Sequence, residues 1–387
     1  MRPSVCFVSP SPASAQLLLS GHGTKVGGAE VQIAHLASAL ARRGHAVTCI
    51  VAAGAGAVAT TRADGVRVIP AYAPERRGGV AGWLGVKWPK LWRALREADA
   101  DVYLTRGMNW HAGAVALFAR RHRRRCAFWM AAEDDVLVLA QGNGLPAHIG
   151  ACYRYGIRAA DAIIAQTQRQ RELMREIAGR DCTVIPNMWV GPSDTSDDPE
   201  PVQPMDVLWV GNIRPRKRPE LALAVARRLP ELRFAIVGGP AAGCEELWRQ
   251  VEESAMGLAN VSLIGAVPRQ RVHAYYRASR ILLHTSHSEG FPNVFLEAWG
   301  HGLPVVSTFD PDGIIACYDL GRVGESAEEL ARGIADLTGD HTSYARASAN
   351  AAQYVRRHHD PETIVETLGD LLTELVAARF EAGGGSP

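Results

Sequence analysis

The chain has no cysteine pattern typical of a disulfide-linked or zinc-binding protein. Its 387 residues include seven cysteines, an odd number, and no C-x-x-C pair occurs among them. Three of them, Cys6, Cys49 and Cys126, stand inside apolar runs. Disulfide frameworks and zinc sites depend on paired or regularly spaced cysteines, so neither is expected here, and a reducing cytosol is the expected location.

Long hydrophobic runs and an excess of charge of one sign are missing as well. No apolar run approaches the ~18 residues of a membrane-spanning helix, and Pro3, Pro10 and Pro12 interrupt the N-terminal segment that superficially looks like a secretory signal. The 42 Lys and Arg nearly balance the 40 Asp and Glu, which gives no reason to expect a nucleic-acid partner. We therefore expect a cytoplasmic protein that is either soluble or attached peripherally to the inner face of the membrane.

Apolar residues are plentiful, and their arrangement predicts an α/β protein of two domains. With 387 residues, 47% of them hydrophobic, the chain is long enough for two ordinary cores. Short apolar runs alternate with amphipathic helical patterns, which is typical of parallel sheets. Residues 191–204 are rich in Pro, Asp and Ser without periodicity and predict a linker. We expect Rossmann-like domains over residues 1–190 and 205–355, followed by a C-terminal helix and tail over residues 356–387.

The most informative stretch is SEGFPNVFLEAWGHGLPVV at residues 288–306, which lies between two apolar runs that predict buried parallel strands. Gly290 permits a close backbone approach, and Pro292 favours the start of a helix over about residues 293–299. The N-terminus of such a helix is suited to bind an anion. Glu289 and Glu297 flank this point with seven residues between them. The spacing alone more often belongs to a strand, a turn and a helix with a capping acid.

The phrase EGFPNVFLEAWGHGLPVVS resembles the signature of the retaining glycosyltransferases of family four. The resemblance implies the GT-B fold, in which two Rossmann-like domains face a central cleft and the last helix crosses back to the first domain. It implies that Glu289 contacts the donor sugar and Glu297 the ribose of the nucleotide. It also implies that the diphosphate is surrounded by the backbone of Phe291, Pro292, Asn293 and Val294.

The loop GNIRPRKRPE at residues 211–220 adds a cluster of positive charge after a predicted strand. By resemblance, Lys217 matches the family's diphosphate-binding lysine, whereas Asn212 stands where the family has an arginine. We predict that Arg214 supplies the missing charge, although a charge run is often only a solvated surface. The loop glycine Gly211 and the later strand ends at Gly238 and Val267 are expected to frame the nucleotide.

Several loops of the first half are expected to face the cleft, because loops at the carboxyl ends of parallel strands line the ligand site. The turn at Gly27 and Gly28 resembles the GGAE turn of the family, although a glycine pair before a helix is often a plain loop. The other expected cleft or acceptor residues are Arg106, Asn109, His111, Glu133, Asp134 and Asp135.

Two features of the first half leave alternatives open. The acids Glu133, Asp134 and Asp135 resemble a metal-binding motif, but adjacent acids on a loop are typical of a helix N-cap and first turn, so no metal is assigned. The family's donor-contacting histidine is absent between residues 128 and 135. His111 is a substitute for it or a structural histidine.

The segment WLGVKWPKLWRALREAD, residues 83–99, combines Trp83, Trp88 and Trp92 with lysines and arginines. One interpretation is an interfacial helix that meets a lipid-linked acceptor. The interpretation we favour is an ordinary amphipathic helix whose tryptophans pack in the core.

Taken with the resemblance, these patterns predict an enzyme that moves a hexosyl group from a UDP- or GDP-hexose to the hydroxyl of a sugar or lipid-linked acceptor. The expected setting is the biosynthesis of a glycan, polysaccharide or glycoconjugate. Retention of configuration is implied by the family, and no metal or other cofactor is expected. The alternatives are a sugar-nucleotide epimerase of the GT-B fold and a non-catalytic sugar-nucleotide binder.

Overall fold

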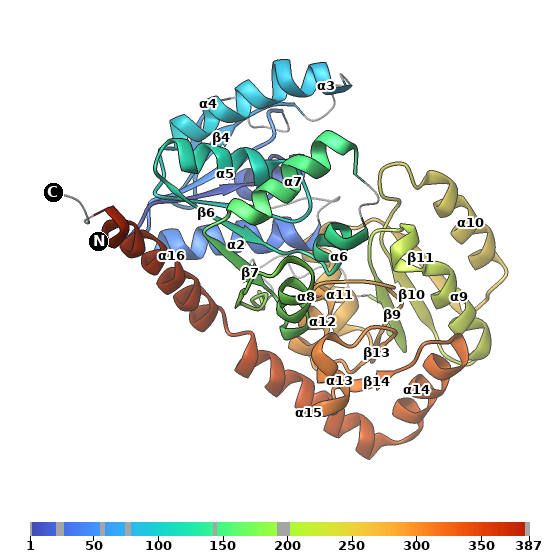
Figure 1. Cartoon of the computed structure of the whole chain (residues 1–387). Helices are drawn as coiled ribbons and strands as arrows, with labels where there is room; N and C mark the ends of the chain where they lie inside the picture. The colour runs from blue at the N-terminus through green and yellow to red at the C-terminus, as the bar shows by residue number, and fades with distance from the viewer. Residues whose placement is uncertain are drawn as a thin grey trace. The chain divides into compact units, whose positions relative to one another are not determined.

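A computed structural model describes residues 2–20, 27–54, 59–73, 79–141, 145–191 and 202–383. Figure 1 colours the chain by position in the sequence. The chain divides into two compact units. The first unit comprises Met1–Asn187 with Glu362–Pro387, and the second comprises Met188–Pro361. Most of the segment predicted as a linker, residues 192–201, lies outside the described residues, as do the last four residues of the tail.

The first unit is built on an eight-stranded sheet with the order β3-β4-β2-β1-β5-β6-β7-β8. All neighbouring strands are parallel except the hairpin of β3 and β4. The strands are β1 (Val5–Val8), β2 (Val47–Val51), β3 (Thr61–Ala63), β4 (Val66–Pro70), β5 (Val102–Arg106), β6 (Arg125–Trp129), β7 (Ala162–Ala165) and β8 (Thr183–Val184). The central strands are apolar on both faces because helices cover both sides of a parallel sheet.

The helices of this unit connect and cover those strands. They are α1 (Pro12–Ser20), α2 (Gly28–Arg42), α3 (Gly79–Gly82), the π-helical turn η1 (Trp83–Lys87), α4 (Trp88–Ala98), α5 (His111–Arg121), α6 (Asp134–Gln141), α7 (Ala147–Ala159), α8 (Gln168–Ala178) and α16 (Pro361–Gly383). In the described part of the chain, no helix is long and apolar enough to cross a membrane.

The tryptophans of η1 and α4 pack inward. Trp83, Trp88 and Trp92 are partly buried against the hydrophobic core of the first unit. The rings of Trp83 and Trp88 both contact Trp110, at centroid distances of 5.6 and 5.7 Å. The tryptophans therefore pack against the core, as in the favoured interpretation of this helix.

The second unit contains a six-stranded, all-parallel sheet with the order β11-β10-β9-β12-β13-β14. Its strands are β9 (Val207–Val210), β10 (Phe234–Val237), β11 (Val261–Gly265), β12 (Ile281–His284), β13 (Val305–Ser307) and β14 (Gly321–Val323). Its helices are η2 (Pro215–Lys217), α9 (Pro219–Arg228), α10 (Glu245–Met256), α11 (Arg269–Arg277), α12 (Asn293–Gly300), η3 (Pro311–Gly313), α13 (Ile314–Cys317), α14 (Ala327–Gly339) and α15 (His341–His358).

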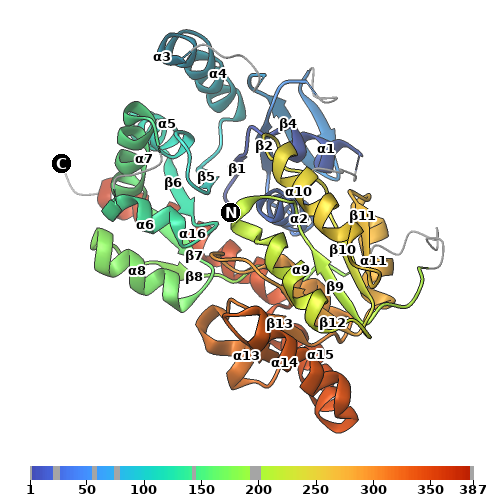
Figure 2. The same ribbon diagram turned by 90° about the vertical axis from the view of Figure 1, so that its right-hand side faces the viewer.

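Alternate residues of the strands enter two separate cores. Val207 and Trp209 pack in the cluster that includes residues of α9, α10 and α14, whereas Leu208 packs in the cluster that includes residues of α11 and α12. Figure 2 shows the strands of this sheet with α9, α10 and α11 beside them. This period of two, with both faces covered, makes each unit a Rossmann-like layer of helix, sheet and helix.

Candidate functional site

The strand order of the second unit fixes where a ligand site can form. From β9 the chain proceeds to β10 and β11 on one side, and it then returns to place β12, β13 and β14 on the other side. The loops after β9 and β12 therefore diverge from a topological switch point, which is the place where open α/β sheets bind ligands. Lys217 follows β9 and Glu289 follows β12, so the switch point brings together two residues that the sequence predicted for one site.

Hydrogen bonds hold these two loops together. Trp209 Nε1 donates to Thr285 Oγ1 at 2.9 Å, and Thr285 Oγ1 lies 2.7 Å from the carbonyl oxygen of Lys217 and 3.0 Å from that of Arg218. The backbone N–H of His287 donates to the carbonyl oxygen of Arg216 at 2.9 Å. Arg218 has a φ of 48°, a left-handed conformation that ends η2 and starts α9. The backbone that carries Lys217 is thus fixed against the loop that carries Glu289.

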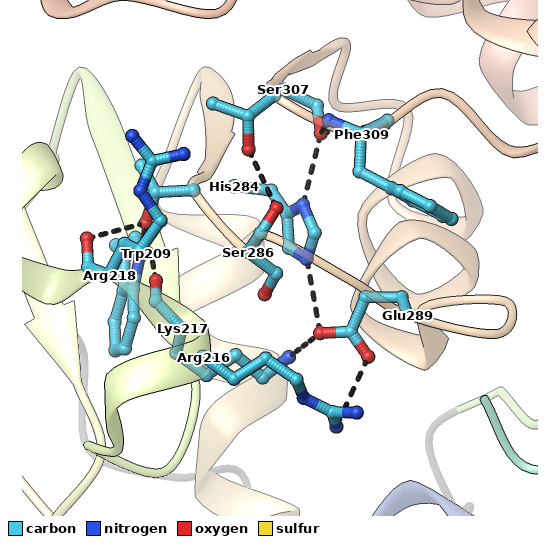
Figure 3. Close-up of polar contacts among 11 residues, drawn as sticks. Trp209, Arg216, Lys217, Arg218, His284, Ser286, Glu289, Ser307 and Phe309 are labelled. Atoms are coloured by element: carbon cyan, nitrogen blue, oxygen red, sulfur yellow. Dashed lines mark hydrogen bonds and ion pairs between the residues drawn. The ribbon is translucent and has the colours of Figure 1, made fainter. Parts of the chain in front are cut away.

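Lys217 and Glu289 form a buried ion pair (Figure 3). Lys217 Nζ donates to Glu289 Oε1 at 2.6 Å, and the Arg216 guanidinium lies 3.7 Å from Oε2 of the same carboxylate. Glu289 is only 8% exposed. Burial alone would raise the pKa of Glu289, but Lys217, followed by His284 and Arg216, holds this pKa well below its usual range. Burial lowers the pKa of Lys217, an effect that Glu289 opposes. The site therefore contains an ionised carboxylate with fixed positive charge around it.

Glu297 lies on α12, and two residues of α11 contact its carboxylate. Arg269 contacts Glu297 Oε1 at 2.8 Å, and the Tyr276 hydroxyl donates to Oε2 at 2.9 Å. Glu297 is 7% exposed. Both of its oxygens are therefore oriented by neighbours, which leaves their remaining lone pairs as the acceptors for a ligand hydroxyl.

The helix predicted after Pro292 is α12, and Pro292 is its N-cap. Asn293 and Val294 are the first two residues of the helix, so their N–H groups lie at the positive end of the helix dipole. The Phe291 side chain is buried against Trp299 and His359, with ring centroids 6.3 and 4.7 Å away. Gly290 is buried in the same loop. The N-terminus of α12 is thus anchored by an aromatic residue beside Glu289.

The glycine loops of the second unit also meet at the switch point. Gly238 has a φ of 143°, and a Cβ atom there would lie 1.9 Å from the carbonyl oxygen of Gly211. Only glycine allows the ends of β9 and β10 to approach so closely. Asn212 follows Gly211 and is partly buried. Val267 is partly buried against the core cluster that includes α12.

Arg214 starts the turn η2 in extended conformation and is partly buried. Its charge contributes to the lowered pKa of Lys217, so the two cations lie within electrostatic range of each other. Arg216, another cation of the same loop, is the arginine that lies beside Glu289, at 3.7 Å.

In the first unit, the expected residues after β5 make mainly internal contacts. Arg106 donates to Asn187 Oδ1 at 2.7 Å and stacks over the Trp129 ring, and burial lowers its pKa to about 10. The Asn109 side chain donates to the carbonyl oxygens of Arg106 and Gly107 and accepts from the backbone N–H of His111. His111 Nε2 is hydrogen-bonded to the Tyr72 hydroxyl. Burial and nearby Lys87 lower the pKa of His111 to about 3, so its ring is neutral.

The acidic triplet lies at the start of a helix, as the favoured interpretation predicted. Asp134 and Asp135 form the first turn of α6, which follows Glu133. Asp135 Oδ2 accepts from the backbone N–H groups of Ala131 and Ala132, and burial raises its pKa to about 6. Among the residues that the structure describes, no group of three or more His, Cys, Asp or Glu side chains is arranged to hold a metal ion.

Gly27 and Gly28 lie at the start of α2, where Gly27 is the N-cap. A Cβ atom on Gly27 would lie 2.5 Å from Glu30 Oε2, so the carboxylate of the helix's own first turn rests against this glycine. The preceding residues 21–26 of the predicted loop lie outside the described residues.

Both halves of the chain match models of glycosyltransferase families. A model of a glycosyl transferase 4-like domain matches residues 27–188, and a model of glycosyl transferases group 1 matches residues 194–354. The chain is similar to D-inositol 3-phosphate glycosyltransferase from Mycobacteroides abscessus, with 36% identity over 104 residues that cover 26% of this chain and 24% of the relative. The enzyme of that name from Mycolicibacterium smegmatis is 31% identical over 169 residues, or 39% and 37% of the two chains. The chain spans less than half the length of these curated relatives.

Solved structures resemble the whole chain. Sucrose-phosphate synthase from Thermosynechococcus elongatus aligns with a TM-score of 0.76 and 18% identity, covering 97% of this chain and 100% of that one. HepE from Anabaena, solved in complex with UDP-glucose, aligns with a TM-score of 0.71 and 18% identity, covering 96% and 100%. At these identities the likeness shows the fold, which is GT-B. With glycosyltransferase models matching both halves, the chain belongs to the family-four glycosyltransferases of GT-B fold.

Proposed function

We propose that this protein transfers a hexosyl group from a nucleoside diphosphate sugar to an acceptor hydroxyl, with retention of configuration. The observation that carries the proposal is the ionised Glu289, held by Lys217 at 2.6 Å at the switch point of the second unit. The helix α12 starts at Asn293, directly after the loop that carries Glu289. A carboxylate for the sugar and cations for the phosphates are thus adjacent, which is what donor recognition and leaving-group departure need. The family match favours transfer over epimerisation or binding alone.

The roles proposed for the residues follow from their charges and positions. Lys217, with Arg214, attracts the diphosphate, and the first N–H groups of α12 at Asn293 and Val294 add hydrogen bonds to it. As the bond between sugar and diphosphate breaks, these groups stabilise the negative charge that develops on the leaving group. Glu289 accepts a sugar hydroxyl, and Glu297 accepts a ribose hydroxyl. The loop backbone at Gly211, Asn212, Gly238 and Val267 is proposed to surround the nucleotide.

For the donor we propose UDP-glucose first and a GDP-hexose second. The UDP-glucose complex of HepE, a protein of the same fold, supports this order. For the acceptor we propose a sugar or lipid-linked hydroxyl. The residues predicted for it in the first unit, including Asn109 and His111, follow β5 at that sheet's own switch point between β1 and β5.

The test combines binding and turnover. Thermal unfolding with UDP, GDP, UDP-glucose and GDP-mannose identifies the base, because a ligand at ~100 times its dissociation constant adds about 2.7 kcal/mol to stability. Release of nucleoside diphosphate is then measured with the stabilising donor and a panel of sugar and lipid-linked acceptors. NMR of the product gives the anomeric configuration. An inverted product contradicts retention, and an isomerised donor formed without acceptor identifies an epimerase instead.

We expect activity to be independent of divalent metal ions. In this proposal the charge of the diphosphate is met by Lys217, arginines and the start of α12, and the carboxylate of Asp135 is engaged by backbone N–H groups at the start of α6. Turnover measured after EDTA treatment should match untreated enzyme within about twofold, a change well under ~1 kcal/mol. Loss of activity that Mn²⁺ or Mg²⁺ restores would instead place the acids Glu133 and Asp134 in the catalytic site.

The two arginines beside Lys217 are expected to differ. Arg214→Ala should weaken binding of UDP by about tenfold, because it removes a cation near the proposed diphosphate position. Arg216→Ala should affect turnover more than binding, because its guanidinium faces Glu289. Calorimetry with UDP and steady-state kinetics separate the two effects. If Arg214→Ala is silent and Arg216→Ala loses UDP affinity, Arg216 supplies the charge that Asn212 lacks.

A further inference from the structure

The buried histidine at the end of β12 has no part in the function proposed above. His284 is 3% exposed, and its ring edge packs on Phe295 with centroids 4.8 Å apart. Its Nδ1 atom lies 3.0 Å from Ser307 Oγ. Its Nε2 atom is buried and has no hydrogen-bond partner among the described residues, yet it lies 3.7 Å from Glu289 Oε1 (Figure 3). A polar atom buried in this way calls for a physical account.

The surroundings determine which nitrogen carries the proton. Burial lowers the pKa of His284, Glu289 opposes this effect and Lys217 adds to it, and the pKa remains below its usual value, so the ring is neutral at pH 7. The negative charge of Glu289 favours the tautomer with the proton on Nε2. Nδ1 then accepts from Ser307 Oγ, whose single proton can serve either Nδ1 or the carbonyl oxygen of Phe309 at 2.8 Å. The Nε2–H group is thus aimed at Glu289.

Glu289 Oε1 is shared by two possible donors. Lys217 Nζ donates to it at 2.6 Å, and His284 Nε2 stands at 3.7 Å, beyond hydrogen-bond distance. Lys217 is also the cation assigned to the diphosphate. A phosphate that attracts this ammonium group weakens its bond to Oε1. A buried carboxylate that loses its partner is strongly destabilised, so a replacement donor is needed at the same oxygen.

We propose that His284 is a positioning residue that replaces Lys217 on Glu289 when the donor binds. As Lys217 turns toward the diphosphate, Nε2–H of His284 closes by about 1 Å to reach hydrogen-bond distance from Oε1. Glu289 then stays oriented toward the sugar while the lysine serves the leaving group. Ser307 supports the exchange because its hydroxyl donates to Nδ1 of His284, which keeps the proton of the ring on Nε2. This inference rests on the function proposed above for Lys217 and Glu289.

The test compares His284→Leu with His284→Gln, because the glutamine amide nitrogen can replace Nε2–H whereas leucine cannot donate. His284→Leu should lower kcat by about tenfold or more and change the calorimetric Kd for UDP less than about threefold. His284→Gln should recover most of the lost kcat. The matched control is His358→Gln, at an exposed residue of α15, and it should leave both values unchanged.

A spectroscopic measurement tests the exchange without turnover. In enzyme with ¹⁵N-labelled histidine, the His284 ring is assigned by comparison with His284→Gln. The expected result is an Nε2–H tautomer whose Nε2 proton shifts downfield when UDP is added, as its hydrogen bond shortens. An Nδ1–H tautomer, an Nε2 signal unmoved by bound UDP, or equal loss of kcat in the Leu and Gln variants would each overturn the inference. An enzyme that binds UDP but turns over no sugar nucleotide contradicts the proposed transfer, and the NMR titration still decides the exchange.

Discussion

Lys217→Ala should lower kcat by at least a hundredfold and also destabilise the second unit. The variant removes the cation at 2.6 Å from Glu289 and leaves a carboxylate that is 8% exposed, to which Arg216 and His284 are the next partners in the described part of the chain, both at 3.7 Å. Breaking one side of a buried ion pair commonly costs about 3 to 5 kcal/mol of folding stability. The loss of rate follows because no ammonium group stabilises the leaving diphosphate, and about 3 kcal/mol of transition-state stabilisation corresponds to roughly a hundredfold.

The double variant Lys217→Ala with Glu289→Gln separates the two effects. Removing both charges eliminates the unpaired buried carboxylate, so urea unfolding should show most of the lost stability regained. Activity should stay low, because the catalytic cation is still absent and the carboxylate proposed to meet the sugar is removed as well. Lys90→Ala, at an exposed lysine of α4, is the control that removes a positive charge elsewhere. Normal kinetics in Lys217→Ala would contradict the role of this lysine, and a double variant as unstable as Lys217→Ala would show that the lost stability does not come from the unpaired carboxylate.

The sequence predicted most of the frame around this pair because the frame depends on local patterns. The strands β9 and β12 are short apolar runs, and Pro292 marks the start of α12, so each could be located from a few neighbouring residues. The two edge strands β3 and β14, with three residues each, were not predicted. Their burial is incomplete and their apolar runs are too short to show a period. The last helix was expected near residue 356, and α16 starts at Pro361.

The contacts within the site could not be predicted to the same extent, because they depend on residues far apart in the sequence. Arg216 faces Glu289 because of the tight turn of η2 and the left-handed Arg218, and neither is visible in a run of cations. Tyr276 approaches Glu297 from a separate helix. His284 lies within an apolar strand, where a histidine gives no sequence signal of function. Its place between Ser307 and Glu289 appears only when β12 and β13 pair.

The two glutamates should have separable roles. Glu297→Gln is expected to weaken binding of free UDP by roughly tenfold to a hundredfold, because the carboxylate oriented by Arg269 and Tyr276 no longer accepts ribose hydroxyls as a charged group. Glu289→Gln is expected to spare UDP binding and to lower kcat by about a hundredfold. Glu289 precedes the start of α12 and is proposed to meet the transferring sugar, where a charged hydrogen bond strengthens as the ring gains positive charge.

Calorimetric titration of both variants with UDP and with 2′,3′-dideoxyuridine diphosphate, beside steady-state kinetics with the intact donor, tests this assignment. If Glu297 binds the ribose, wild type should prefer UDP over the dideoxy compound, and Glu297→Gln should lose most of this preference, whereas Glu289→Gln should keep it. Glu220→Gln, at an exposed residue of α9, removes a carboxylate from the same unit as a control. Gln keeps the size of Glu, so the substitutions disturb the fold little. A loss of affinity confined to one ligand also cannot arise from general unfolding, because unfolding would weaken the binding of both ligands. Should Glu289→Gln abolish the preference for ribose while Glu297→Gln leaves it intact, the two carboxylates exchange roles, and Lys217 then pairs with the nucleotide-binding acid rather than with the one that faces the sugar.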